Sequence, residues 1–127
     1  GNLVKEVRHA GGKPSVALNA GTPIWLIEEV APLLDMILLI NGNAAHGRKQ
    51  NIDAQIEQKI CQARAMLDKA GRTDAVVSVD GNISFENAKR AKCCGANVFV
   101  LGTASIYRDG GTVSEHMRDL RTCLQTL

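Results

Sequence analysis

Aromatic residues are scarce in this sequence: they make up 3% of the 127 residues, with one tryptophan, one tyrosine and two phenylalanines. The hydrophobic content of 45% therefore comes mainly from Val, Ile, Leu and Ala, which suits buried parallel strands. The sequence also lacks a strong excess of one charge, since the formal net charge is +2. So small a charge, without a stripe of basic and aromatic residues, gives no indication of nucleic-acid binding.

Long apolar runs and paired cysteine motifs are also missing. No hydrophobic stretch approaches the roughly 18 residues of a membrane span, and the sequence shows no signal peptide. The four cysteines, Cys61, Cys93, Cys94 and Cys123, have no C-x-x-C spacing. We therefore predict four reduced thiols in a cytoplasmic protein, folded as one domain over residues 1–127.

What the sequence does contain is four short hydrophobic runs that are typical of buried strands, at residues 15–19, 36–41, 75–80 and 98–102. A helix-like stretch follows each run, which predicts an α/β fold. We expect four parallel strands in the order 1-2-3-4, with the helices on the outer face. A complete (β/α)₈ barrel typically needs about 250 residues, so the sequence predicts a (βα)₄ half barrel of the TIM-barrel type.

The helical segments show start and stop signals. Thr22 and Pro23 predict a helix that begins with Thr22 as N-cap and Pro23 at the first helical position. Helices are also predicted at residues 2–10, at residues 52–70, from Ser84 as N-cap to a close at Gly95, and at about 113–125. His9 and His116 fall on such helices, and we expect both to be surface residues. Because the first helix looks like the tail of a preceding element and no initiator methionine is present, we expect an upstream part to be missing.

Asp80 is the sharpest candidate for a functional residue. It ends the third predicted strand and is followed by Gly81 and Asn82. A carboxylate at the end of a buried strand is costly unless it is paired or bound to a metal, and an adjacent glycine lets the backbone approach a ligand. The alternative is that Asp80 merely caps the following turn.

Three further segments carry candidate binding residues. Gly102 and Thr103 begin a turn of small residues whose backbone N–H groups are suited to hold a phosphate, although many ordinary turns look similar. Asn19 places an amide at the end of the first strand, which a plain strand and turn do not explain. His46 and Gly47 lie in a basic, glycine-containing loop that suits a cover over an anionic ligand, or is simply solvated.

These segments, in this order, resemble the carboxyl-terminal half of the ribulose-phosphate 3-epimerase family. Residues 16–23 (VALNAGTP) are similar to the family's V-A-L-N-P-G-T-P, with Ala20 in place of proline. Residues 79–83 (VDGNI) are similar to V-D-G-G-I, and residues 95–107 (GANVFVLGTASIY) to G-A-D-V-F-V-A-G-S-A-I-F. Asn82 departs from the second glycine, and the segment that contains His46 departs from the family's N-P-G-F-G-G-Q.

The resemblance implies a sugar-phosphate epimerase that inverts the carbon next to the carbonyl of a ketose phosphate. In such enzymes one carboxylate removes a proton, a second returns one, and a divalent metal, commonly zinc, stabilises the enediolate between these steps. Asp80 then matches one acid–base carboxylate and a metal ligand, while Gly81, Gly102 and Thr103 match phosphate-contacting positions. The second carboxylate and the other metal ligands are implied outside this chain.

Two other functions remain open at this stage. Instead of an epimerase half barrel, the chain could be a half barrel without catalysis that binds phosphate or serves in assembly. A third possibility is another phosphate-binding barrel enzyme, such as those of tryptophan or histidine biosynthesis. Because half a barrel has unpaired edges and an apolar inner face, we expect pairing with a second copy or with the missing amino-terminal half. The small net charge and the lack of long apolar runs lead us to expect no nucleic-acid or membrane partner.

Overall fold

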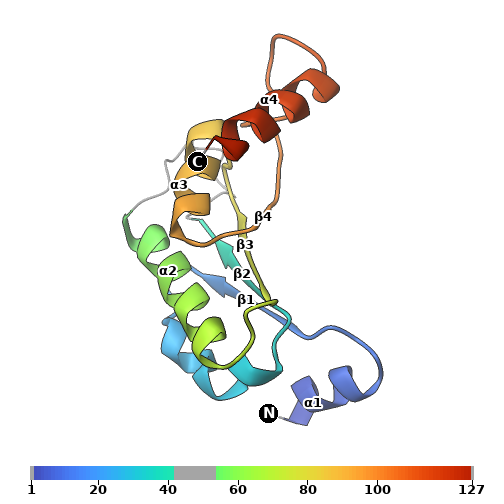
Figure 1. The fold of residues 1–127 in the computed structure, drawn as a ribbon, viewed down its shortest axis with the longest axis vertical. Coiled ribbons are helices and arrows are strands. Elements are labelled where there is room, and N and C mark those ends of the chain that lie inside the picture. The colour runs from blue at the N-terminus through green and yellow to red at the C-terminus, as the bar shows by residue number, and fades with distance from the viewer. Residues whose placement is uncertain (1, 42–53, 127) are drawn as a thin grey trace.

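The structure is a computed structural model that describes residues 2–41 and 54–126. Strands and helices alternate along it, as Figure 1 shows. In chain order the elements are α1 (Asn2–His9), β1 (Ser15–Asn19), the 3₁₀-helix η1 (Ile24–Leu33), β2 (Met36–Ile40), α2 (Ala54–Lys69), β3 (Val76–Asp80), α3 (Phe85–Cys94), β4 (Val98–Phe99) and α4 (Val113–Gln125).

The four strands form one sheet in the order β1-β2-β3-β4, and every neighbouring pair is parallel. The predicted α/β half barrel of the TIM-barrel type is therefore confirmed. In-register pairing puts Leu18, Leu39, Val79 and Phe99 in one row across the sheet. Since all strands run the same way, the side chains of one row point to the same face.

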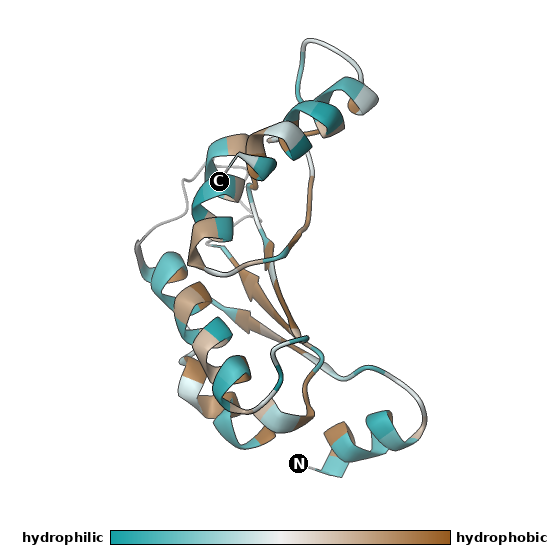
Figure 2. Cartoon of the chain, in the orientation of Figure 1, coloured by the Kyte–Doolittle hydropathy of each residue, from teal (hydrophilic) through white to brown (hydrophobic). Residues whose placement is uncertain are grey.

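The two faces of the sheet differ in burial. The row of Leu18, Leu39 and Val79 is buried in the main hydrophobic cluster, to which α2 contributes Ile60 and Leu67. Figure 1 shows η1, α2 and α3 on that side of the sheet, and Figure 2 shows the strands as a strongly hydrophobic layer. On the opposite, inner face Val98 and Val100 remain more than 40% exposed, as in a barrel that is open along one side.

Two local predictions were wrong in detail. The segment after Pro23 is a 3₁₀-helix, and Pro23 itself is its N-cap, so Thr22 does not cap it. Pro32 lies inside this helix, and because proline has no N–H and crowds the preceding turn, it disfavours a regular α-helix there. The fourth strand is shorter than predicted and spans only Val98–Phe99, although the Val100 N–H still donates to the Val79 carbonyl at 2.9 Å.

Charged residues stabilise the edge where the strands begin. Asp35, just before β2, accepts from Arg8 of α1 at 3.0 Å and from Arg72 at 2.6 Å. Both guanidinium groups also donate to backbone carbonyls, of Leu33 and Leu34 respectively. This network fastens α1 and the β3 entry to one edge, while the opposite edge carries the candidate site residues.

Two predictions from composition can be compared with the described residues. All four cysteines are free thiols, as predicted. Within residues 2–41 and 54–126, no helix combines the length and the apolar character that crossing a membrane would require.

Candidate functional site

The carboxyl ends of β1, β2 and β3 are level with one another. The register aligns Asn19 with Ile40 and Ile40 with Asp80, so the three residues form one row at the edge of the sheet. Two strand spacings separate the Asn19 and Asp80 backbones, or roughly 10 Å. The structure thus brings together two polar residues that are 61 positions apart in the sequence, as the strand pattern predicts.

Asp80 lies half-buried at the last position of β3. Its carbonyl accepts from the Asn41 N–H at 2.7 Å, which extends the β2–β3 ladder by one residue. None of the ion pairs formed within the described residues includes the Asp80 carboxylate. A half-buried carboxylate that is paired with no cation from the described ranges is poorly compensated there, which is the expected condition of a group that meets a ligand.

The turn after Asp80 is held in a defined shape. Gly81 and Asn82 both have positive φ, of 102° and 52°. The Asn82 carbonyl accepts from the Asn87 side chain at 2.8 Å, and Ser84 caps α3 by accepting from the Asn87 N–H at 3.1 Å, as the sequence predicts for Ser84. This turn presents Asp80 and the start of α3 at the same edge.

Asn41 fixes Gly81 in this turn. The Asn41 side chain is buried, and its amide donates to the Gly81 carbonyl at 3.1 Å. A Cβ atom at Gly81 would lie 2.6 Å from the Asn41 carbonyl oxygen. Asn41, also a strand-end residue, therefore has a structural role that joins β2 to the Asp80 turn.

The turn after β4 has a different character. The Gly102 carbonyl accepts from the Ser105 and Tyr107 N–H groups, both at 3.1 Å, while Thr103 is exposed. A Cβ atom at Gly102 would meet nothing within 4 Å, so there is open space beside its backbone. Because β4 pairs with β3, this turn lies beside the Gly81–Asn82 turn. We call Asn19, Asp80, Gly81, Asn82, Gly102 and Thr103 the strand-end group.

Lys59 supports the strand-end group from the helix layer, and sequence reasoning missed it. Its side chain is buried, and its ammonium donates to the carbonyls of Asn19, Ala20 and Thr22, the last at 2.7 Å. The ammonium therefore satisfies the hydrogen-bonding capacity of backbone carbonyls in the connection that follows β1. Its position beside Ile60 and three residues after Ile56, on the apolar stripe of α2, is the signal that could have revealed it.

Replacing Lys59 by methionine is expected to lower the free energy of unfolding by about 1–3 kcal/mol, because the carbonyls lose their donor. The Thr22 amide, which donates to the Asn19 carbonyl at 3.0 Å, should exchange its hydrogen faster. Urea denaturation and hydrogen exchange followed by mass spectrometry measure the two effects. Lys69→Met on the exposed part of the same helix is the matched control and should change neither. Unchanged exchange at Thr22 in Lys59→Met would contradict this role.

His116 corrects the expectation of a surface residue. It is 2% exposed, and its ring nitrogens lie 2.9 Å from the Ile106 carbonyl oxygen and 2.8 Å from that of Gly110. The ring thus anchors the connection between the Gly102 turn and α4. The adjacent glycines at 110 and 111, both with positive φ, let the backbone wrap around the ring, which helical periodicity alone does not indicate. His9 is exposed, as predicted.

Other candidate features lie elsewhere or outside the described residues. His46 and Gly47 fall within residues 42–53, which the structure does not describe. A cleft of about 700 Å³ between η1 and α2 is lined by Ile24, Trp25 and Met66, and no member of the strand-end group lines it. In the described part of the chain, no cluster of three or more His, Cys, Asp or Glu residues is arranged to hold a metal ion.

Comparison with known proteins gives a consistent result. The profile of the ribulose-phosphate 3 epimerase family matches residues 1–106. Ribulose-phosphate 3-epimerase of Bacillus subtilis is 34% identical over 101 residues, which cover 80% of this chain and 46% of that protein. The chloroplastic ribulose-5-phosphate-3-epimerase of Arabidopsis thaliana is also 34% identical over 101 residues, covering 80% and 35%. The chain spans about half the length of the curated relatives it matches, or less.

Proposed function

The chain belongs to the ribulose-phosphate 3-epimerase family, and we propose that it forms the carboxyl-terminal half of a sugar-phosphate 3-epimerase. The observation that carries this proposal is the strand-end row, in which Asp80 ends β3 level with Asn19 of β1. Functional residues of α/β barrels lie at the carboxyl ends of the strands, and the row provides a carboxylate and an amide there.

Asp80 is proposed as one of two acid–base groups. A carboxylate at this edge is suited to take the proton from the carbon beside the ketose carbonyl, and a second carboxylate on the opposite face of the sugar returns one. The second group would come from the part of the barrel that this chain does not span. Asn19 is proposed as a hydrogen-bonding partner of the substrate, since its side chain is exposed in the same row.

The phosphate is proposed to bind at the two turns after β3 and β4. The open space beside Gly102 lets an anion approach the backbone, and the exposed Thr103 adds a hydroxyl. Gly81 and Asn82 present the neighbouring turn at the start of α3, where N–H groups favour negative charge. His46 and Gly47 are proposed to cover the same ligand and lie outside the described residues.

A divalent metal, most simply zinc, is proposed with Asp80 as one ligand. The described residues do not make a complete metal site by themselves, because they bring no second and third ligand to Asp80. The remaining ligands would come from the other half of the barrel. A metal held there would stabilise negative charge on the substrate oxygen. The acid–base role of Asp80 is argued from its position at the end of β3 and does not depend on the metal.

Pairing of the half barrel follows from its inner face. Val98 and Val100 are exposed on that face, and both β1 and β4 are edge strands in the described sheet. Exposed apolar surface and unpaired strand edges favour association. We propose that the inner face is covered by the other half of the barrel, or by a second copy of this chain.

The test is proton exchange on a ketose phosphate. A polypeptide that joins this chain to the rest of the barrel should incorporate solvent deuterium at the carbon beside the carbonyl of ribulose 5-phosphate and yield the 3-epimer. The 127-residue chain alone should not, because the second carboxylate lies outside it. Phosphate-dependent binding without any exchange in the joined protein would instead favour the non-catalytic half barrel.

A further inference from the structure

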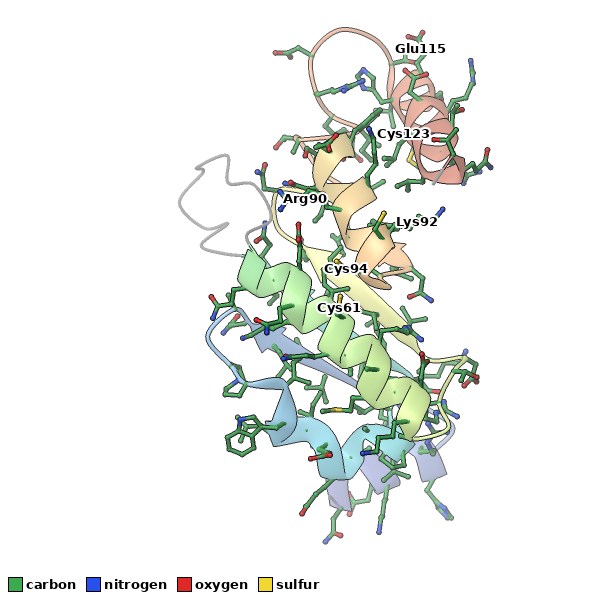
Figure 3. All side chains as sticks on the ribbon, turned by 60° about the vertical axis from the view of Figure 1, so that its left-hand side comes forward. Cys61, Arg90, Lys92, Cys94, Glu115 and Cys123 are labelled. Atoms are coloured by element: carbon green, nitrogen blue, oxygen red, sulfur yellow. The ribbon has the colours of Figure 1, made fainter. Side chains whose placement is uncertain are left out.

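Residues of α2 and α3 that face each other recur at the same spacing along both helices. Glu57 of α2 forms an ion pair with Arg90 of α3. Four residues further along each helix lie Cys61 and Cys94. Because residues four apart share one face of a helix, the same interface that pairs Glu57 with Arg90 places the two cysteines opposite each other. Figure 3 shows Cys61 and Cys94 pointing toward one another between the two helices.

The helices approach closely just beyond the two cysteines. The Arg64 Nε donates to the Gly95 carbonyl at 3.3 Å. A Cβ atom at Gly95 would lie only 2.8 Å from the Arg64 Cγ, so the end of α3 is in direct contact with α2. The Cys61 side chain also acts on the Cys94 thiol as a hydrogen-bonding neighbour, in agreement with their facing positions. Two cysteines that face each other across closely packed helices are placed to form a disulfide.

We propose that Cys61 and Cys94 are a redox-active thiol pair that closes to a reversible disulfide by exchange with a small-molecule disulfide such as oxidised glutathione. This modification site lies in the helix layer and is separate from the strand-end group, so it does not depend on the proposed function. The bridge would enclose residues 61–94, a segment that contains β3 and Asp80, and would fasten α2 to α3 around that strand.

The exchange proceeds in two balanced steps. The exposed Cys61, as thiolate, attacks one sulfur of oxidised glutathione, whose S–S bond breaks and releases one glutathione thiolate, which takes up a proton. The Cys94 thiolate then attacks the Cys61 sulfur of the mixed disulfide and displaces the second glutathione. Two protein thiols are oxidised, and one oxidised glutathione is reduced to two glutathione molecules.

The environment of Cys94 determines how the second step depends on pH. Burial, followed by the hydrogen bond to Cys61 and the nearby Glu57 and Cys93, together raise the pKa of Cys94 to about 11. Only the thiolate attacks, so at neutral pH most Cys94 is unreactive. Closure should therefore accelerate by roughly tenfold for each pH unit between 7 and 9, as the thiolate fraction does. Two cations lie close to this cluster: Arg90, one turn before Cys94 and paired with Glu57, and Arg64, which donates to the Gly95 carbonyl.

The experiment maps disulfides in the folded 127-residue chain. The chain, with its fold verified by circular dichroism, is incubated with oxidised glutathione at pH 8.5, its remaining thiols are alkylated, and its peptides are identified by mass spectrometry. We expect a cross-linked pair of peptides containing Cys61 and Cys94, the loss of two of the four thiols, and full recovery with dithiothreitol. Cys93→Ser and Cys123→Ser are matched controls that should keep this cross-link.

The variants of the pair distinguish closure from simple surface modification. Cys94→Ser should stop at a stable glutathione adduct on Cys61, since the attacking thiol is missing. The oxidised parent chain should also unfold at a temperature higher by roughly 5–10 °C, because a closed loop restricts the unfolded chain. The proposal fails if the folded parent accumulates glutathione adducts without the cross-link, or if Cys93 or Cys123 pairs as often as Cys94.

Discussion

Replacing Asp80 by asparagine in the joined protein should lower the rate of proton exchange on the ketose phosphate by about 10²–10⁴-fold, the usual cost of losing one general acid–base group. Asparagine keeps the shape of the side chain but does not take up a proton. The backbone hydrogen bond from Asn41 to the Asp80 carbonyl, at 2.7 Å, does not depend on the side chain and should remain. The fold should therefore survive while the chemistry is lost.

Solvent-deuterium incorporation at the carbon beside the carbonyl is the measurement, because it reports proton removal directly and not product release. Asp74→Asn is the matched control: Asp74 lies in the turn just before the same strand begins, and its side chain is 76% exposed. The control should exchange at the parent rate, and both variants should have the parent's circular dichroism and unfolding midpoint. Exchange at the parent rate in Asp80→Asn would show that Asp80 is not the acid–base group.

The strand pattern was the most informative part of the sequence for both fold and site. Apolar runs that end in Asn19 and Asp80 predict parallel strands, and parallel strands in register bring their ends together. The sequence also predicts the N-cap at Ser84, because capping depends on a local contact between a side chain and a nearby backbone N–H. These features follow from interactions over a few residues or from a simple periodicity.

The features that could not be predicted depend on contacts between distant segments. The position of Lys59 on the apolar stripe of α2 indicates burial, but the carbonyls to which it donates lie 37 to 40 positions away and no local pattern identifies them. The burial of His116 likewise requires a loop that folds back over the ring. Thr22 and Pro23 correctly indicated that a helix begins near residue 24. They did not reveal that this helix is of the 3₁₀ type, which Pro32 within it favours.

Replacing Gly81 by alanine should lower the free energy of unfolding by roughly 2–4 kcal/mol, through positive φ and overpacking together. The φ of Gly81 is 102°, and the added Cβ would lie 2.6 Å from the Asn41 carbonyl oxygen. Because this oxygen belongs to the backbone, it cannot move aside by a change of side-chain rotamer. Relief requires the β2 and β3 ends to separate, which strains the Asn41 bond to the Gly81 carbonyl. Urea denaturation of the protein measures the loss.

Gly102→Ala is the matched control, because Gly102 is the other glycine that follows a strand in the strand-end group. Its backbone has no positive φ, and an added Cβ would meet nothing within 4 Å, so stability should change by less than about 0.5 kcal/mol. In the joined protein, however, the same methyl group would occupy the open space proposed for the phosphate and should raise the KM. If Gly81→Ala is as stable as Gly102→Ala, the packing role of Gly81 is wrong. If Gly102→Ala leaves the KM unchanged, the space beside Gly102 is not the phosphate site. Gly81 would then still be required for folding, but Gly102 would not be required for binding the ligand.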